Sequence, residues 1–126
     1  MITIRDEQLN ALAQARHEEF ETRATEHLRE FFPERVDAMP LERFREFIRR
    51  CVDRARTFGL TSEQAVICFA HLSLLLGEGF DSEPRWPFVP LLLRQEEYHQ
   101  NDRAKAAMLL AYELKAKGSV AKDLAG

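Results

Sequence analysis

One pair of side chains has residue types and a spacing that could support chemistry. Cys68 and His71 are three residues apart in the apolar segment 65–76, so on a helix they take neighbouring positions. A cysteine beside a histidine can form a thiolate nucleophile or half of a metal site. A segment that is apolar all round gives a nucleophile no access, and the other three histidines show no ligand spacing to each other. We therefore interpret the pair as a buried thiol beside a hydrogen-bonded core histidine, and we expect no catalytic residue, no metal and no cofactor.

A basic segment is the second candidate for chemistry. Residues 41–58 carry six arginines against three acids, an excess that could indicate nucleic-acid binding. On a helix, however, the three carboxylates fall in the middle of the polar face with arginines on both sides. The pairs expected along this helix are Glu46 with Arg49 and Arg50, and Asp53 with Arg49 and Arg56. A phosphate-binding face would not carry carboxylates through its centre, so we predict that the chain does not bind nucleic acid.

The irregular stretch 77–90 is the main candidate for contact with a partner protein. It holds three of the five prolines and the only tryptophan. If the prolines fix its rings outward, they form a rigid apolar ridge of the kind that anchors interfaces. If the rings fold back, they plug one end of the helical domain instead. The residues of the candidate partner site in this stretch are Phe80, Asp81, Arg85, Trp86 and Phe88.

Arg16 and His27 complete the candidate partner site. On the wheel of the first predicted helix both fall within the apolar arc, beside Leu9, Phe20 and Phe31. Either the two polar side chains are buried and paired, or this stretch of helix faces something other than its own core. A long arginine can also extend past an apolar edge to water.

The elements that must position these residues are helices. Apolar residues recur at helical spacing from Thr3 to Pro33, from Pro40 to Gly59, from Thr61 to Leu76, over 91–97 and over 101–117. Gly118 is expected to stop the last helix and to leave a disordered tail over residues 119–126. The predicted fold is all-α: a single-domain bundle of four to five helices over residues 1–118, around a central helix that is apolar between residues 65 and 76.

Length and composition limit the class of protein. The 126 residues suit one domain, and 45% hydrophobic with 31% charged residues is typical of a globular chain. Two lone cysteines suit a reducing compartment. The N-terminus does not read as a signal peptide, and the longest apolar stretch is too short to span a bilayer. We therefore expect a cytoplasmic protein without a membrane partner.

Three stretches of the sequence resemble a family of small helical proteins that are encoded beside type VI secretion spike and effector genes in Gram-negative bacteria. The resemblance covers residues 1 to about 93. The matching stretches are Ile2 to Leu12; Phe20, His27-Leu28 and Phe32-Pro33; and Phe58 to Glu63 followed by Leu75 to Asp81, Pro84 and Pro87. In this chain the order Arg85-Trp86-Pro87 departs from the family's usual tryptophan–proline region.

The resemblance implies a binding function. Roles as adaptor, effector chaperone and immunity protein all fit such a family, and it offers no catalytic residue to carry over. We predict a protein-binding accessory factor of a type VI secretion effector, which links the effector to the spike or holds it. The alternative is a cytosolic immunity protein that neutralises a toxin. An enzyme is the less favoured class, because the polar residues sit singly among apolar ones.

Overall fold

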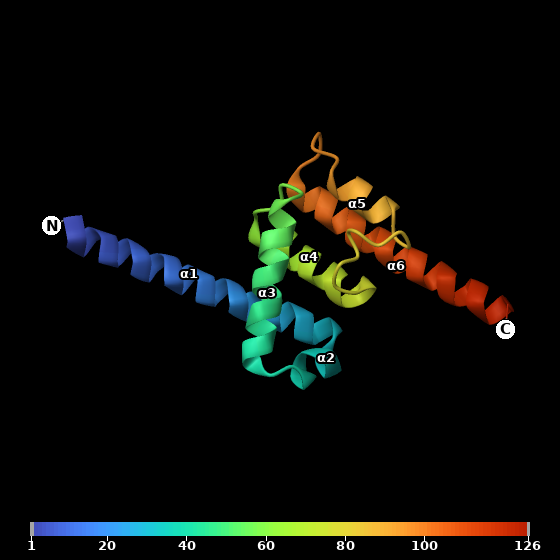
Figure 1. Ribbon diagram of the computed structural model, residues 1–126, viewed down its shortest axis with the longest axis horizontal. Coiled ribbons are helices and arrows are strands. Elements are labelled where there is room, and N and C mark those ends of the chain that lie inside the picture. The colour runs from blue at the N-terminus through green and yellow to red at the C-terminus, as the bar shows by residue number, and fades with distance from the viewer. Residues whose placement is uncertain (1, 126) are drawn as a thin grey trace. The chain divides into compact units, whose positions relative to one another are not determined.

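The structure is a computed structural model that describes the backbone of residues 2–125 and the side chains of residues 7–117. The described backbone forms six α-helices and no strand, which confirms the all-α class (Figure 1). The sequence patterns predict four to five helices. The helices are α1 (Ile2–Phe31), α2 (Pro33–Ala38), α3 (Leu41–Arg56), α4 (Glu63–Leu76), α5 (Phe88–Leu93) and α6 (Gln100–Ala125).

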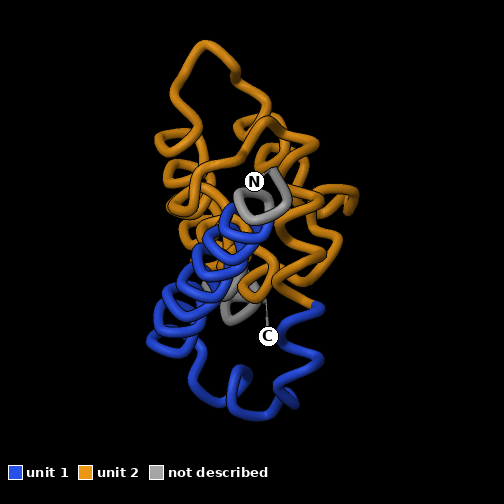
Figure 2. The backbone as a smooth tube through the Cα atoms, turned by 90° about the vertical axis from the view of Figure 1, so that its left-hand side faces the viewer, with its two compact units in different colours: residues 1–46 blue, residues 47–126 orange. Residues whose placement is uncertain are grey.

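The chain divides into two compact units (Figure 2). Unit 1 comprises residues 1–46 and unit 2 comprises residues 47–126, with the boundary inside α3. Each unit has buried apolar residues of its own, so each is described by itself. The single domain expected over residues 1–118 stays a prediction.

Unit 1 is built on α1 and the short α2, which pack against each other. Pro33 has no backbone N–H, so it ends the first helix and serves as the first residue of α2, a helix that the apolar pattern does not predict. Leu28 on α1 and Val36 on α2 are both buried. Arg29 Nε also donates to Asp37 Oδ1 over 3.0 Å, which adds a polar contact between the two helices.

Unit 2 is organised around α4 and α6, which pack side by side (Figure 1). α4 begins with a capping residue one position after Thr61, where the sequence pattern starts: Ser62 is the N-cap, and its hydroxyl accepts from the backbone N–H of Ala65 over 3.1 Å. Nine of the fourteen residues of α4 are buried. Packing on more than one side therefore stabilises this helix. Its place as the centre of a single bundle stays a prediction.

A second contact joins the start of α4 to the start of α6. The side-chain oxygen of Gln100 accepts from the backbone N–H groups of Thr61 and Ser62, over 2.6 and 2.9 Å. The hydroxyl of Ser62 donates to the side chain of Asn101. The N–H groups before and at the N-cap of α4 are thus satisfied by a residue almost forty positions later in the chain.

The bounds of α5 and α6 differ from those predicted. α5 spans Phe88–Leu93 instead of residues 91–97, because Pro90 lies in its first turn, where a missing N–H costs no helical hydrogen bond. α6 continues through Gly118 to Ala125, so the predicted end at Gly118 was wrong. A single glycine costs a helix only about 1 kcal/mol relative to alanine. Helical backbone thus takes the place of the predicted disordered tail from residue 119 to 125; residue 126 lies outside the described residues.

Candidate functional site

The stretch between α4 and α5 leaves α4 through two glycines with left-handed backbone. Gly77 has φ +105° and Gly79 has φ +91°, values that side-chain-bearing residues rarely adopt. These two glycines therefore let the chain turn sharply away from the end of α4. The residues that follow form hydrogen-bonded turns, such as the one from Phe80 N–H to the carbonyl of Gly77 over 3.2 Å. The stretch is consequently an ordered series of turns.

Two arginines of α3 hold this stretch. Arg50 Nε donates to Glu78 over 2.7 Å, and Arg54 Nη2 donates to both oxygens of Asp81 over 2.5 and 2.6 Å. The Asp81 side chain is only 9% exposed, whereas that of Arg54 is 42% exposed, so the carboxylate of this pair is largely shielded from water and the guanidinium is not. Asp81, which we placed in the candidate partner site, is thereby engaged inside unit 2.

These contacts change the predicted pairing of the α3 arginines. The pair between Arg56 and Asp53 along the helix is confirmed, with 3.7 Å between nitrogen and oxygen. In addition, the guanidinium groups of Arg50 and Arg54 reach acids more than twenty residues away in the chain. Helix periodicity gives only the pairs within a helix, so it could not reveal these two. The local charge excess of α3 is in part compensated by the stretch 77–90.

The aromatic rings of the stretch do not share one environment. Phe80 is fully buried, with its ring centroid 5.1 Å from that of Phe69 on α4. Trp86 is also buried, with 7% of its surface exposed, whereas Phe88 is 64% exposed. Phe80 and Trp86 thus pack inward, as the plug interpretation expects, and the exposed ridge of three rings is not formed. Phe88 is the ring that faces solvent.

Trp86 and Arg85 form a further contact. The Arg85 guanidinium carbon lies over the Trp86 ring, 4.9 Å from its centroid, a cation–π arrangement. Arg85 itself is exposed. The indole nitrogen of Trp86 is buried without an acceptor, which is a cost for a tryptophan donor. Arg85 therefore covers the ring from the solvent side, and its charge remains available at the surface.

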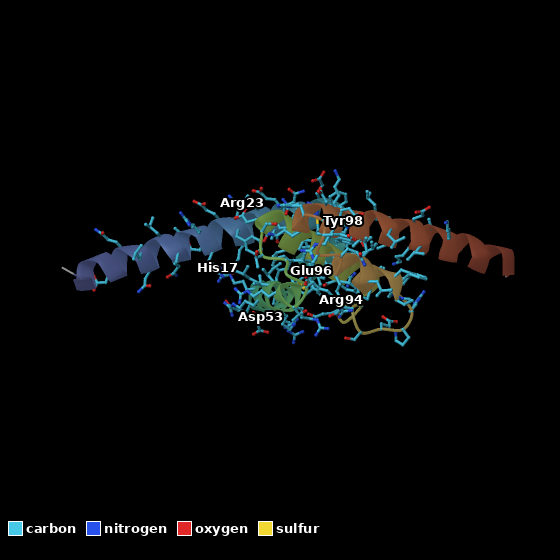
Figure 3. The ribbon with its side chains drawn as sticks, turned by 90° about the horizontal axis from the view of Figure 1, so that it is seen from above. His17, Arg23, Asp53, Arg94, Glu96 and Tyr98 are labelled. Carbon is cyan, nitrogen blue, oxygen red and sulfur yellow. The ribbon has the colours of Figure 1, made fainter. Side chains whose placement is uncertain are left out.

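The N-terminal part of α1 has a different character from the rest of the described chain. Every side chain from Glu7 to Glu19 is exposed, including Arg16, Leu9 at 56% and Leu12 at 59%. His17, which is labelled in Figure 3, belongs to this segment. Burial begins at Phe20. Arg16 is therefore not the buried, paired side chain of the first interpretation, and a partner-facing role for it stays a prediction.

His27 lies further along α1, in its packed part. It is half-buried, and its ring centroid is 5.0 Å from that of Phe31. Burial lowers the pKa of His27, and the nearby Glu30 partly opposes this effect. The structure therefore does not bring Arg16 and His27 together with Phe80, Asp81, Arg85, Trp86 and Phe88 in one described site: the first two belong to unit 1 and the other five to unit 2.

The Cys68–His71 pair has the structural role predicted for it. Both side chains are buried, and the Nε2 of His71 is hydrogen-bonded to the Tyr112 hydroxyl over 2.5 Å. Burial raises the pKa of the Cys68 thiol, and the same cause raises the pKa of Cys51 to about 12. Both thiols are therefore protonated at neutral pH. The prediction of a buried thiol beside a hydrogen-bonded histidine is confirmed.

Metal-ligand clusters and membrane-spanning helices are both absent from the described residues. Among the side chains that the structure describes, no three histidine, cysteine or acidic groups are gathered so that they could hold a metal ion. Within residues 2–125, no helix combines the length and the apolar character needed to cross a membrane.

Sequence reasoning missed one residue, Arg103 on α6. It is 7% exposed, and its Nη1 donates to the backbone carbonyls of Phe58 and Leu93, over 3.4 and 3.1 Å. A signal was present in the sequence: Arg103 precedes Ala107 and Ala111 by four and eight residues, so it lies in line with two fully buried alanines. An arginine in that register is a candidate buried cation.

Comparisons with known proteins add no assignment to this geometry. No family model matches the chain, and neither a curated protein nor a solved structure matches it.

Proposed function

We propose that the chain is a protein-binding accessory factor that docks the N-terminal part of α1, residues 7–19, on a partner protein. The partner we propose is a type VI secretion effector or its spike, which the chain links or holds as adaptor or chaperone. In this proposal the role is one of binding without catalysis.

The observation that carries the proposal is a length of helix with no buried side chain. A helix gains most of its stability in proteins by packing an apolar face, and isolated segments of this length are marginal in water. Leu9 and Leu12 lie on the same arc as Phe20, where burial begins, so the apolar face continues past the point at which the chain covers it. A helix that offers such spaced apolar anchors fits the groove of a partner.

The link to secretion rests on the sequence resemblance. One of the three matching stretches is Ile2 to Leu12, so it includes both exposed leucines. A binding face would explain why that stretch is apolar at these positions although none of the side chains in the described range 7–117 buries it. The exposed ring of Phe88 offers a second contact point in unit 2.

The test is affinity capture from the Gram-negative host with mass spectrometry. The chain is compared with the variant Leu9→Glu/Leu12→Glu and with the control Ala11→Glu/Gln14→Glu. The control adds the same charge to the same segment on the opposite face. We expect the first variant to lose the partner and the control to keep it, with both helical by circular dichroism.

Three results would contradict the proposal. Equal retention of the partner by both variants would exclude the leucine face, and so would equal loss. Rescue of a poisoned host by the chain, with the neighbouring toxin as the captured protein, would replace the accessory role with that of an immunity protein.

A further inference from the structure

Arg16 lies in the middle of the exposed apolar stripe of α1. An α-helix turns by about 100° per residue, so Arg16 is within roughly 20° of Leu9 and roughly 40° of Leu12, between the two around the helix. Along the axis it lies one turn, about 6 Å, after Leu12 and one turn before Phe20, where burial begins. A surface that covers both leucines and continues toward Phe20 therefore also covers the guanidinium of Arg16.

The chain supplies no anion for this cation. Among the side chains of residues 7–117, no carboxylate forms an ion pair with Arg16, although Glu19 is three residues away on the same helix. Glu21 pairs with other groups: it lies 2.9 Å from His17 Nε2 and 3.5 Å from Arg45 Nε. Because Arg16 is exposed, water solvates its charge in the free chain.

Docking of the stripe removes that water. Burying a charged side chain is costly unless an opposite charge pairs with it. A groove lined only by apolar side chains would gain from covering the leucines and lose from covering an unpaired guanidinium. A groove with a carboxylate opposite Arg16 avoids this loss, because a guanidinium and a carboxylate can form two parallel charged hydrogen bonds.

We propose that the partner's groove carries an aspartate or glutamate side chain that pairs with Arg16, one helical turn beyond the surface that covers Leu12. The inference rests on the proposed function, because it names the chemistry of the groove that receives residues 7–19. In this arrangement Leu9 and Leu12 supply apolar contact, and Arg16 sets the register of the helix. A helix shifted by one turn would place Leu12 against the carboxylate, so the pair disfavours that register.

The competing explanation is an arginine that extends past the edge of the stripe to water. The two explanations differ for Arg16→Met, which keeps an unbranched apolar side chain and removes the charge. If the guanidinium only reaches water, this variant should bind the partner as tightly as the unmutated chain or more tightly. If the guanidinium pairs with a buried carboxylate, the variant leaves that carboxylate unpaired, and binding should weaken by roughly thirtyfold or more.

The test measures binding of the full chain to the protein that it captures from the host and that Leu9→Glu/Leu12→Glu fails to capture. Calorimetry compares Arg16→Lys and Arg16→Met, with Gln14→Met on the opposite face as the control. Affinity should fall from arginine to lysine to methionine at position 16, since an ammonium keeps the charge and loses the paired donors. Gln14→Met should leave affinity unchanged. Arginine, lysine and methionine have similar helix propensities, so the variants should stay helical by circular dichroism.

A cross-linking experiment locates the carboxylate on the partner. A water-soluble carbodiimide joins a lysine amine to a carboxylate in direct contact, with loss of water. The first lysine of the unmutated chain is Lys105, so the residue introduced by Arg16→Lys is the only lysine of unit 1. We expect mass spectrometry to find position 16 joined to an aspartate or glutamate of the captured protein. Gln14→Lys, on the opposite face, should form no such bond.

Undiminished affinity of Arg16→Met would overturn the inference, and so would a yield of cross-linked partner at position 16 no greater than at position 14. If Arg16→Met binds normally while Leu9→Glu/Leu12→Glu does not, this inference fails and the proposed function stands. If Leu9→Glu/Leu12→Glu captures every protein that the unmutated chain captures, the proposed function fails, and this inference fails with it.

Discussion

Helix α4 and residues 7–19 of α1 are of similar length and opposite environment. Nine residues of α4 are buried, whereas every side chain from Glu7 to Glu19 is exposed. Both segments carry leucines at helical spacing. The difference is that the leucines of α4 are covered by this chain and those of α1 are not. In the first segment apolar residues stabilise the fold, and in the second we propose that they bind a partner.

The comparison predicts its largest effect at Phe69 on α4. The Phe69 side chain is 1% exposed and contacts the rings of Phe58 and Phe80. Phe69→Ala should lower the free energy of unfolding by about 3–5 kcal/mol, because it opens a cavity in a packed core. Urea denaturation followed by circular dichroism measures this change. A loss below about 1 kcal/mol would show that α4 does not depend on this packing.

The same comparison between a covered and an uncovered apolar side chain can be made at Trp86 and Phe88, which are two residues apart. Trp86→Ala should cost about 3 kcal/mol because the ring is buried, and Phe88→Ala about 0.5 kcal/mol because it is exposed. Thermal unfolding by circular dichroism gives both values. Because Trp86 is the only tryptophan, its fluorescence reports the burial directly in the unmutated chain. A small loss for Trp86→Ala, with partner binding weakened, would restore the anchor interpretation.

The ion pair between Arg54 and Asp81 should contribute an intermediate amount. Asp81→Asn should cost about 1–2 kcal/mol, since the carboxylate is largely buried and accepts two charged hydrogen bonds, although Arg54 is partly exposed. The matched control is Asp53→Asn, whose partner Arg56 is exposed, and it should cost less than about 0.5 kcal/mol. Equal losses in the two variants would mean that the stretch 77–90 does not depend on this pair.

The buried thiol of Cys51 gives the packed region a pH dependence. Its pKa in the folded chain is about 12, above the ordinary 9.0. Stability from this group is thus fully present below pH 9 and falls as pH rises from 9 toward 12. The slope should be about 1 kcal/mol per pH unit. Cys51→Ala should flatten the unfolding free energy measured between pH 8.5 and 10.5. Cys68 and Tyr112 also have raised pKa values, so part of the slope should remain.

The smallest change in the free energy of unfolding is expected for a substitution in the exposed part of α1. Leu12→Ala should change the free energy of unfolding by less than about 0.5 kcal/mol, since the side chain is exposed and alanine favours helix. The same substitution should weaken partner binding if the leucine is an anchor. A large loss of stability would show that this face packs within the chain, which would remove the contrast with α4.

Sequence patterns predicted the bounds of the helices better than the burial of individual side chains. The pattern from Thr61 to Leu76 predicted the bounds of α4 closely, because caps and apolar spacing are local properties of a sequence. Burial of Trp86 could not be predicted, because prolines and glycines stiffen a segment equally whether it turns inward or outward. The exposure of Leu9 and Leu12 could not be predicted either, since periodicity identifies an apolar face and does not identify the residues that cover it.

The candidate site was predicted least well for the same reason. Its seven residues were chosen by type and spacing, yet Phe80 and Trp86 are core, and Asp81 is paired with Arg54. Pairing between residues distant in the chain has no signature in a single sequence. Arg103 shares its register with Ala107 and Ala111, which indicates burial, but its acceptors are the carbonyls of Phe58 and Leu93, and backbone groups this distant have no signature in the sequence.

The bond from Gln100 to the start of α4 has a consequence for the order of events during synthesis. The amides of Thr61 and Ser62 obtain their acceptor only when Gln100 has been added, and at about 5–20 residues per second this takes roughly 2–8 s. During that interval α4 has left the peptidyl transferase centre without the helix that covers it. Until α6 has formed, α4 lacks the helix that covers it, so the packing of unit 2 must wait for residues well beyond α4 in the chain.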